Sequence, residues 1–365
     1  MSGDLQVTAS APKAAAGTPS APSAGPRPWD ALPRLALAHL PTPLTRLDRF
    51  SRVVGAEIWL KRDDIGSIAH AGNKARKLEF LLADAVARGC DVVLTMGGPQ
   101  SNHARATAAY CAGLGLRCIL VLGGDPPKEE LGNLLLDRLL GAEVVFAGAR
   151  DFAGIAARMA EVAAGLEGSG ARPYAITIGG STPLGAVGFA VAYDELLGQL
   201  IEAGVGANAL YLASASGSTH AGLEVGRRLA GGGPPVQGIA ILKPDAGGSG
   251  EHVAELASDC ATLLGRHETW TALDIRLDVR FMGPGYGSPT AEASQAIALL
   301  ARTEGILADP VYTGKALAGL LAHLREQRTV GPVVFWHTGG AQVLLHPHYA
   351  GPVLDAVAAD EGSVL

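Results

Sequence analysis

The chain has 365 residues, 48% of them hydrophobic, so it is long enough to bury a large core and to form two domains. Its 29 basic and 35 acidic side chains leave a net charge of −6, which offers no broad basic surface for nucleic acid. No stretch approaches the roughly 18 to 20 uninterrupted apolar residues of a membrane helix, and the four cysteines form no Cys-x-x-Cys pair, so neither a membrane-spanning protein nor a disulfide or metal scaffold is expected.

Residues 1–30 are rich in Ala, Pro, Ser and Gly, with almost no large aliphatic residue after Val7. This composition buries too little surface to offset the entropy lost on ordering, so the segment is predicted to be a disordered tail. It lacks the basic start and apolar block of a secretory signal, which makes the cytoplasm the expected location. The cysteines are then expected to be buried hydrophobic side chains in a reducing compartment.

From Leu32 onward, short apolar runs alternate with longer helical patterns, without an internal repeat, as is typical of parallel α/β architecture. The clearest helix is predicted over 74–87, where apolar residues recur at helical spacing and Gly89 follows. Further helices are predicted over 101–112, 131–140 and 152–164, and strands over 91–96, 118–122, 143–146, 174–178, 209–213, 236–242, 274–281 and 333–336. Because such sheets bind ligands beyond the carboxyl ends of their strands, chemistry is expected where a strand leads into a helix.

The segment HAGNKARK, residues 70–77, opens the first helix with three cations, Lys74, Arg76 and Lys77, in one turn. The helix dipole makes each of them unfavourable by roughly a few tenths of a kcal/mol. A lysine held against other positive charges has a lowered pKa, which suits an amine nucleophile. A solvated basic face is the competing interpretation of the same run.

The segment GGPQSNH, residues 97–103, follows a strand and opens a helix. Ser101 or Asn102 fits the ordinary N-cap of that helix. Two amides, a hydroxyl and an imidazole together exceed what a cap requires.

The segment SASGSTHAG, residues 214–222, lies between an apolar strand and the amphipathic helix that contains Leu223 and Leu229. Its small residues let backbone N–H groups approach an anion, and the helix N-terminus adds positive potential, so the segment is a candidate phosphate site. It matches neither the Walker loop nor the dinucleotide motif, so ATP and NAD are not indicated. A plain tight turn with a Ser or Thr N-cap gives the same pattern.

Six segments, running in order from about Pro41 to Ala341, carry a family resemblance: GNKARKLEFLLADA, GGPQSNHARATAA, SASGSTHAGLEVG, GPGYGSPT, DPVYTGKALAGL and FWHTGG. They resemble the fold-type II pyridoxal-phosphate enzymes, in the branch that contains D-cysteine desulfhydrase and 1-aminocyclopropane-1-carboxylate (ACC) deaminase. The resemblance implies an α/β fold of the tryptophan synthase β-like type, with two three-layer domains and largely parallel sheets. A large cofactor domain would comprise residues 31–75 and 186–365, and a small one residues 76–185.

The resemblance also implies roles for individual residues. Lys74 would be the Schiff-base lysine of pyridoxal 5'-phosphate, and Asn102 would hydrogen-bond the 3′-oxygen of this cofactor. Ser101 would contact the substrate carboxylate. The 5′-phosphate would be bound by Lys77, Ser216, Gly217, Ser218 and Thr219, and the substrate side would be lined by Tyr286 and Tyr312.

Thr313 and Thr338 bear on the choice of substrate. ACC deaminases resemble one another in carrying Glu where this chain has Thr313, in contact with the pyridine nitrogen, whereas the desulfhydrases carry Thr at both positions. A neutral hydroxyl stabilises a protonated ring less than a carboxylate does, which suffices when the leaving group is as good as sulfide. The chain departs from many relatives at Ala71, where they have a second Gly, and this departure leaves the substrate fit open.

The expected activity is that of a PLP-dependent carbon–sulfur lyase, which converts D-cysteine to pyruvate, sulfide and ammonia by α,β-elimination. The resemblance further implies a homodimer acting on a small amino acid. ACC deaminase, cysteate sulfo-lyase and a pathway-specific elimination enzyme remain alternatives. A non-catalytic protein that binds a phosphate ligand is another, although it would not need Lys74 or the two tyrosines.

Overall fold

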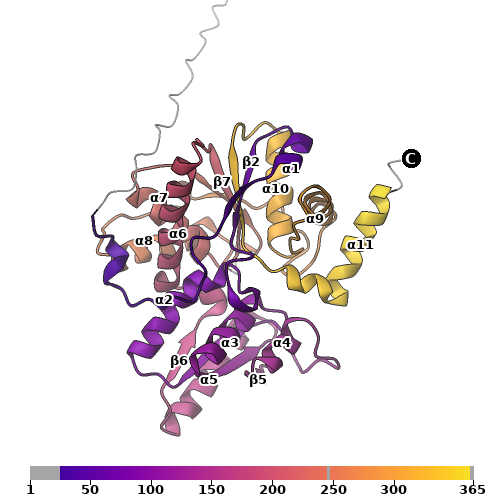
Figure 1. The fold of residues 1–365 in the computed structure, drawn as a ribbon. Coiled ribbons are helices and arrows are strands. Elements are labelled where there is room, and N and C mark those ends of the chain that lie inside the picture. Colours follow the sequence, from indigo (N-terminus) through magenta and orange to yellow (C-terminus); the bar gives the residue numbers. More distant parts are fainter. Residues whose placement is uncertain (1–24, 245–246, 362–365) are drawn as a thin grey trace, which may run out of the picture.

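The computed structural model describes residues 25–244 and 247–361, and its strands form two sheets that lie one above the other in Figure 1. The upper sheet has the strand order β1-β2-β10-β7-β8-β9, and the lower sheet has the order β5-β4-β3-β6. Every neighbouring pair is parallel except β1 and β2. The predicted α/β class with largely parallel sheets is therefore confirmed.

The inner strands of the upper sheet are buried on both faces. Its strands are β1 (Leu44–Arg46), β2 (Ile58–Arg62), β7 (Ala209–Ser214), β8 (Val236–Ala240), β9 (Arg276–Asp278) and β10 (Val333–His337). Alternate residues point to opposite faces: Tyr211 and Phe335 pack with α1 (Asp48–Val54), α9 (Ala291–Glu304) and α10 (Thr313–Arg325). Leu212 and Trp336 pack with α6 (Pro183–Glu202) and α7 (Ser218–Leu229) on the other face. Helix α8 (Gly250–Leu263) packs against α6 and α7 (Figure 1). Near-continuous apolar strands follow from this double burial.

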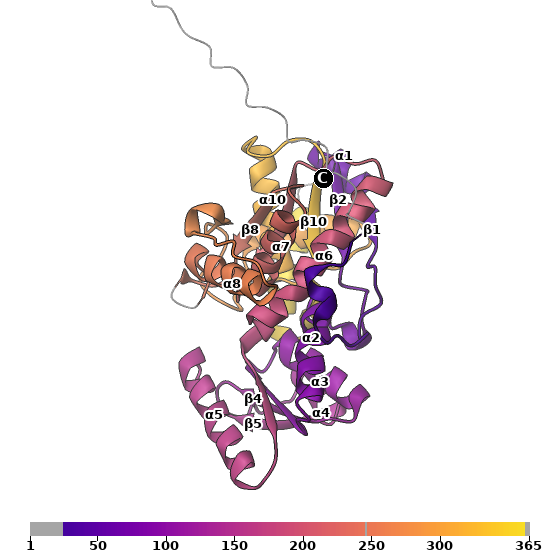
Figure 2. The same cartoon turned by 90° about the vertical axis from the view of Figure 1, so that its left-hand side faces the viewer.

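The lower sheet comprises β3 (Val92–Gly97), β4 (Arg117–Leu122), β5 (Glu143–Phe146) and β6 (Pro173–Ile176). One face packs on α3 (Asn102–Leu114) and α4 (Asn133–Leu139), and the other on α5 (Phe152–Gly168). Figure 2 shows α5 at one end of the molecule and α2 (Lys74–Ala87) between the two sheets. Helix α2 thus brings the predicted lysine segment to the junction. The domain boundaries at 75/76 and 185/186 stay a prediction.

Helix α6 passes a length and hydropathy test for a membrane span if two acidic residues are tolerated. About 61% of its apolar window is buried, and it packs against α2, α7 and α8. This burial among other helices is typical of a helix in the core of a folded domain. The last helix, α11 (Pro347–Glu361), packs against α9.

The predicted helix over 74–87 is confirmed, because α2 spans Lys74–Ala87. The strand predicted over 274–281 is wrong in length: β9 covers only Arg276–Asp278. A 3-10 turn, Ala272–Asp274, precedes it, and the Asp278 carboxylate accepts a hydrogen bond from the Arg280 backbone and bends the chain away. The strand predicted to reach residue 178 likewise ends at Ile176, since Ile178–Gly180 forms another turn.

The predicted disordered tail lies mainly outside the described residues, which begin at 25. Its end departs from the prediction, because Pro28–Ala31 forms a 3-10 turn and Trp29 is buried in a hydrophobic cluster with residues of α2, α6, α7 and α8. Arg27 pairs with Asp194 at 2.7 Å. A single large aromatic residue therefore orders the chain earlier than composition suggests. Three of the four free cysteines are buried, and Cys90 is half-buried.

Candidate active site

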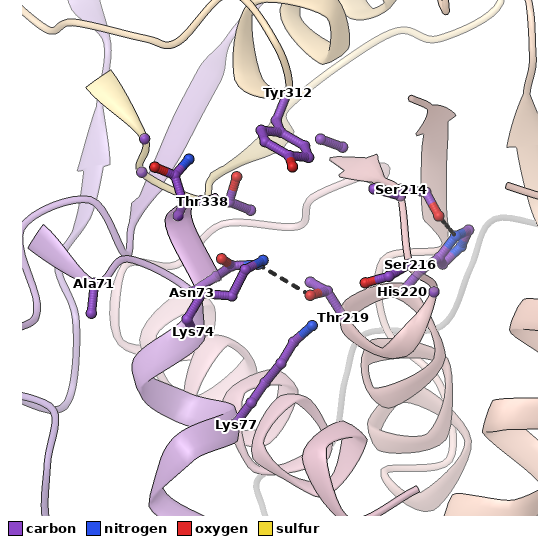
Figure 3. A pocket seen from close by; sticks show the side chains of 16 residues that line it. Ala71, Asn73, Lys74, Lys77, Ser214, Ser216, Thr219, His220, Tyr312 and Thr338 are labelled. Carbon is purple, nitrogen blue, oxygen red and sulfur yellow. Dashed lines mark hydrogen bonds between the residues drawn. The ribbon is translucent and has the colours of Figure 1, made fainter. Parts of the chain in front are cut away.

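A pocket lies where the carboxyl end of β7 meets the N-termini of α2 and α7 (Figure 3). Its lining brings together most of the predicted site residues: Lys74, Lys77, Asn102, Ser216, Gly217, Thr219, Tyr312 and Thr338. An adjoining cavity shares Lys74, Ser216 and Tyr312 and adds Ser101 and Tyr286. Ser218 and Thr313 line neither cavity.

Lys74 is the first residue of α2, and its amine makes no hydrogen bond with any residue that the structure describes. Burial lowers the pKa of this amine to about 8, and the negative charge of Asp309 offsets part of the effect. A lysine amine with such a pKa is partly neutral near physiological pH and can act as a nucleophile or a base.

Lys77 lies one turn further along α2, and in Figure 3 its amine points toward Thr219. The side chain is buried, and its Nζ donates to the carbonyl oxygen of Gly179 at 3.1 Å. Burial and the nearby charge of Lys74 hold the pKa of Lys77 well below its ordinary value. An anion bound beside it would supply the missing negative charge.

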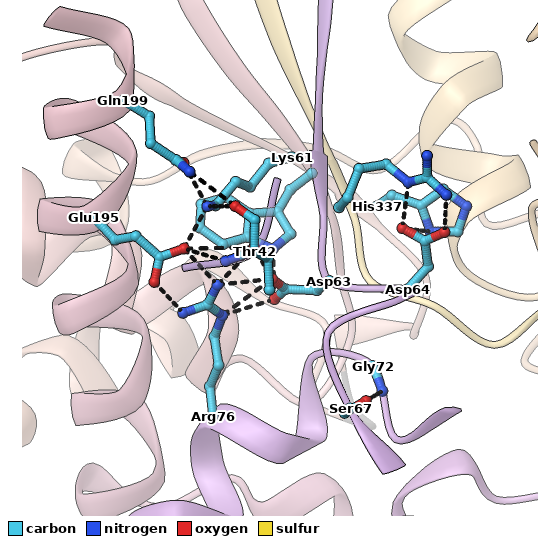
Figure 4. A network of polar contacts seen from close by, with 12 residues as sticks. Thr42, Lys61, Asp63, Asp64, Ser67, Gly72, Arg76, Glu195, Gln199 and His337 are labelled. Carbon is cyan, nitrogen blue, oxygen red and sulfur yellow. Dashed lines mark hydrogen bonds and ion pairs between the residues drawn. The ribbon is translucent and has the colours of Figure 1, made fainter. Parts of the chain in front are cut away.

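Arg76, between these two lysines, points toward Asp63 and Glu195 (Figure 4). Its guanidinium binds the carboxylates of Asp63 and Glu195, both at 2.9 Å, and Glu195 also pairs with Lys61. Trp336 donates to the same Asp63 at 2.8 Å. Because Arg76 and Lys77 are buried and Lys74 lines the pocket, the interpretation of this run as a solvated basic face is wrong.

The loop before α7 has the features of an anion site. Gly217 adopts φ 92°, and a Cβ there would lie 2.9 Å from Leu256, so only glycine fits without strain. The backbone N–H groups of Thr219 and His220 in the first turn of α7 have no acceptor among the described residues. The Ser218 hydroxyl is buried without a partner, although its backbone N–H binds Ser181 at 3.0 Å. Unpaired donors at a helix N-terminus beside Lys77 fit a phosphate group.

Ser101 is the N-cap of α3, and its Oγ accepts a hydrogen bond from the backbone of Ala104 at 3.1 Å. The cap interpretation of Ser101 is thus confirmed, yet the same side chain also lines the cavity beside Lys74. Asn102 is the first residue of α3, and its Oδ1 accepts from Asn133 at 2.9 Å.

Tyr286 and Tyr312 face each other with a hydroxyl separation of 2.5 Å and edge-to-face rings 6.0 Å apart. Burial holds the pKa of Tyr312 well above its ordinary value, and the neighbouring Tyr286 adds to the effect. The Tyr312 hydroxyl therefore stays protonated at physiological pH. The two tyrosines also line an outer chamber of about 540 Å³, which shares Gly98, Ser101 and Phe152 with the inner cavity.

The two threonines differ in their surroundings. Thr338 lines the pocket, and its hydroxyl has no partner among the described residues. Thr313 is fully buried, and its hydroxyl lies 2.5 Å from a carboxylate oxygen of Asp309. Asp309 also accepts hydrogen bonds from the backbone of Val311, Tyr312 and Thr313 at the start of α10. The structure therefore places Thr338, and not Thr313, with its hydroxyl free at the pocket.

The segment before Lys74 is held in an unusual backbone conformation. Ala69, His70 and Gly72 have φ values of 45°, 52° and 61°, and a Cβ on Gly72 would collide with the carbonyl oxygen of Thr338. The buried guanidinium of Arg105 donates to the carbonyl oxygens of Ala69 and His70. Ala71 has an ordinary right-handed conformation, φ −61°, so its methyl group costs no backbone strain.

Several residues that hold the site are absent from the sequence prediction: Arg105, Asn133, Ser181, Glu195 and Asp309. Asp309 and Arg105 could have been found, because they stand in the quoted segments DPVYTGKALAGL and GGPQSNHARATAA. The others lie far along the chain from their partners, and no local pattern indicates the contact.

Comparisons with known proteins show the family to which the chain belongs. The profile of the family described as "Pyridoxal-phosphate dependent enzyme" matches residues 35–339. A protein of Salmonella choleraesuis (strain SC-B67) named D-cysteine desulfhydrase is 41% identical over 325 residues, which cover 87% of this chain and 97% of the relative.

Solved structures give the same picture. A crystal structure of an ACC deaminase homologue has a TM-score of 0.80 and 34% identity, and the match covers 90% of this chain and 98% of the other. The processed form of threonine deaminase isoform 2 from Solanum lycopersicum has a TM-score of 0.63 at 16% identity. That match covers 88% of this chain and 84% of the other, and it supports the fold alone.

Proposed function

The chain belongs to the family of pyridoxal-phosphate dependent enzymes, and from this premise we propose that it catalyses the α,β-elimination of D-cysteine. The products would be pyruvate, sulfide and ammonia, with one water consumed. The 41% identity to a D-cysteine desulfhydrase over nearly the whole chain supports this choice of substrate.

The described residues fit pyridoxal phosphate. The unpartnered amine of Lys74 would bond its aldehyde carbon, and Lys77 with the free N–H groups of α7 would bind its phosphate. Asn102 would hydrogen-bond its 3′-oxygen, and the free hydroxyl of Thr338 is the candidate partner of its ring nitrogen. When bound, this cofactor withdraws electrons from the α-carbon of an amino acid and acidifies the α-proton.

Once the amino group of the substrate has replaced Lys74 at the aldehyde carbon, the freed amine of Lys74 would take that α-proton. A protonated amine has no lone pair to accept it, so burial, which lowers the pKa of Lys74 to about 8, makes this amine a usable base near neutral pH. As the proton leaves the α-carbon, the bond between the β-carbon and sulfur would break, with its electron pair remaining on sulfur.

Ser101 would bind the substrate carboxylate at the N-terminus of α3, where the helix dipole favours a negative charge. Tyr286 and Tyr312 would line the substrate side, and the protonated Tyr312 hydroxyl can donate to the leaving sulfur. The observation that carries the proposal is one pocket that contains both the unpaired Lys74 amine and an anion site.

ACC deamination is the second candidate, because a homologue of ACC deaminase is 34% identical over 90% of this chain. Ring opening needs a strongly electron-withdrawing cofactor, which a carboxylate at the ring nitrogen favours. This chain has Thr313 and Thr338 instead of such a Glu. ACC is therefore expected to be a poor substrate.

The test is a product screen with D-cysteine, L-cysteine, both enantiomers of cysteate, β-chloro-D-alanine and ACC. Pyruvate and 2-oxobutyrate would be measured at equal substrate concentrations. Pyruvate should form from D-cysteine and β-chloro-D-alanine, and ACC should give little 2-oxobutyrate. Turnover of ACC at least as fast as that of D-cysteine would replace the proposal with the second candidate.

The family resemblance also supports a cytoplasmic homodimer. Light scattering on the purified protein tests the assembly, and a mass near 37 kDa, that of one chain, would contradict it.

A further inference from the structure

We propose that Asn133 is a positioning residue that fixes the side-chain amide of Asn102, so that the Nδ2 of Asn102 faces the pocket as a hydrogen-bond donor. This inference rests on the cofactor of the proposed function and not on the choice of substrate. Asn133 is the first residue of α4, is fully buried and lines none of the cavities described above.

The chemistry of the neighbours fixes which end of each amide is nitrogen. The Nδ2 of Asn133 donates to the carbonyl oxygen of Gln100 at 2.9 Å, and a carbonyl can only accept. The same Nδ2 donates to Oδ1 of Asn102 at 2.9 Å. On its other side, Oδ1 of Asn102 lies 3.5 Å from Nη2 of Arg105, which can only donate. The Oδ1 of Asn102 therefore faces two donors. If the amide were flipped, its NH₂ group would face the same two donors and could not bond to them.

With Oδ1 held in this way, Nδ2 of Asn102 has one direction left. It makes no hydrogen bond with any described residue, and it lies 2.8 Å from the position that a Cβ on Gly340 would occupy. Gly340 and Asn102 both line the pocket. An amide donor that is aimed into a pocket and has no partner among the described residues is available to an oxygen of the bound cofactor.

Gln100 holds Asn133 at the backbone as well as at Nδ2, whereas Oδ1 of Asn133 is buried without a partner among the described residues. Its backbone N–H donates to Oε1 of Gln100 at 2.9 Å, and Nε2 of Gln100 donates to the carbonyl oxygen of Leu131 at 2.8 Å. Gln100 precedes Ser101, the cap of α3, so this chain of bonds joins α4 to the start of α3. The position of the Asn133 amide is thus set without any contact with the cofactor.

The experiment replaces Asn133 by Asp, which has the same shape but presents an acceptor to Oδ1 of Asn102. Cofactor-depleted protein would be titrated with pyridoxal phosphate, and both the dissociation constant and the visible absorption maximum recorded. Loss of one oriented hydrogen bond should weaken binding about 3-fold to 10-fold and shift the maximum. Asn208→Asp, an exposed change that also removes an amide donor, should alter neither quantity.

A double-mutant cycle separates positioning from general damage to the fold. In an Asn102→Ala background, Asn133→Asp should no longer change the dissociation constant or the absorption maximum. An undiminished effect in that background would overturn the proposal, as would an unchanged spectrum and affinity for Asn133→Asp alone. If Asn133→Asp does not fold, Asn133→Ala takes its place in the same cycle with the same expectations. No step uses an amino-acid substrate, so a wrong substrate assignment leaves this test intact.

Discussion

The first turn of α2 carries two kinds of buried cation, and the difference between them separates structure from chemistry. Arg76 faces two carboxylates, Asp63 and Glu195, which raise the pKa of its guanidinium despite the opposing effect of burial. Lys77, one residue further, has a carbonyl oxygen as its hydrogen-bond partner, and its pKa is lowered. A paired charge holds two elements together, whereas an unpaired amine beside a pocket awaits a ligand.

The same contrast applies to energetics. Burying a charge costs several kcal/mol unless a partner of opposite sign lies beside it. For Arg76 the partners belong to the fold, so the favourable contacts are present whether or not a ligand is bound. For Lys77 the negative partner would arrive with the phosphate of the cofactor, whereas Lys74 would bond the aldehyde of the cofactor as a neutral amine. Binding should therefore stabilise the folded protein.

The largest expected effect comes from Lys74. Lys74→Ala removes the nucleophile and the base, and the rate of elimination should fall by about 10² to 10⁴-fold or more. Borohydride reduction of the unmodified yellow protein should attach the cofactor to the peptide that contains Lys74. Lys128→Ala, a change in an exposed loop, is the control and should leave colour and activity unchanged. Label on any other lysine would contradict the assignment.

Removal of the paired cation, Arg76, should lower the stability of the fold. Arg76→Met leaves Asp63 and Glu195 without their guanidinium, which should cost about 3 to 5 kcal/mol in the free energy of unfolding. Arg117→Met, in the exposed pair with Glu143, should cost less than about 1 kcal/mol. Urea unfolding of the two variants measures both. An equal loss of unfolding free energy in the two variants would contradict a special structural role for Arg76.

Changes in the anion site should weaken cofactor binding to different degrees. Gly217→Val forces a side chain into a left-handed backbone position next to Leu256, so it should weaken cofactor binding by more than about tenfold. Ser218→Ala removes one hydroxyl and should weaken it only about 2-fold to 10-fold. Titration with pyridoxal phosphate gives both constants. The reverse order would show that backbone N–H groups do not dominate the site.

The smallest expected effect is that of pH on cofactor attachment. Only the neutral amine attacks an aldehyde, and the pKa of Lys74 is lowered from 10.5 to about 8. The rate of attachment to cofactor-depleted protein should thus rise about fivefold between pH 7 and 8 and then level off. Attachment to N-acetyl-lysine, measured in parallel, corrects for titration of the cofactor itself. A midpoint near 10.5 would mean that Lys74 is not perturbed.

The sequence alone predicted the parallel α/β class, the bounds of α2 and the segments that meet at the pocket. These features depend on local properties: apolar periodicity, glycines that permit a left-handed turn, and the donors of a helix N-terminus. The length of β9 and the burial of Trp29 depend on contacts with other parts of the chain, and both differ from the prediction. The burial of Thr313 against Asp309 depends equally on packing.

What only the tertiary structure decided is which charges and amides have partners. HAGNKARK shows three cations in one turn, and both interpretations of that run follow from the same letters. Arg76 meets Glu195 across 119 positions of the chain, and Asn102 meets Asn133 across 31. Electrostatic and hydrogen-bond energies depend on distances in space, which a local pattern does not contain. The fold therefore determines which buried polar groups stabilise the protein and which remain free for chemistry.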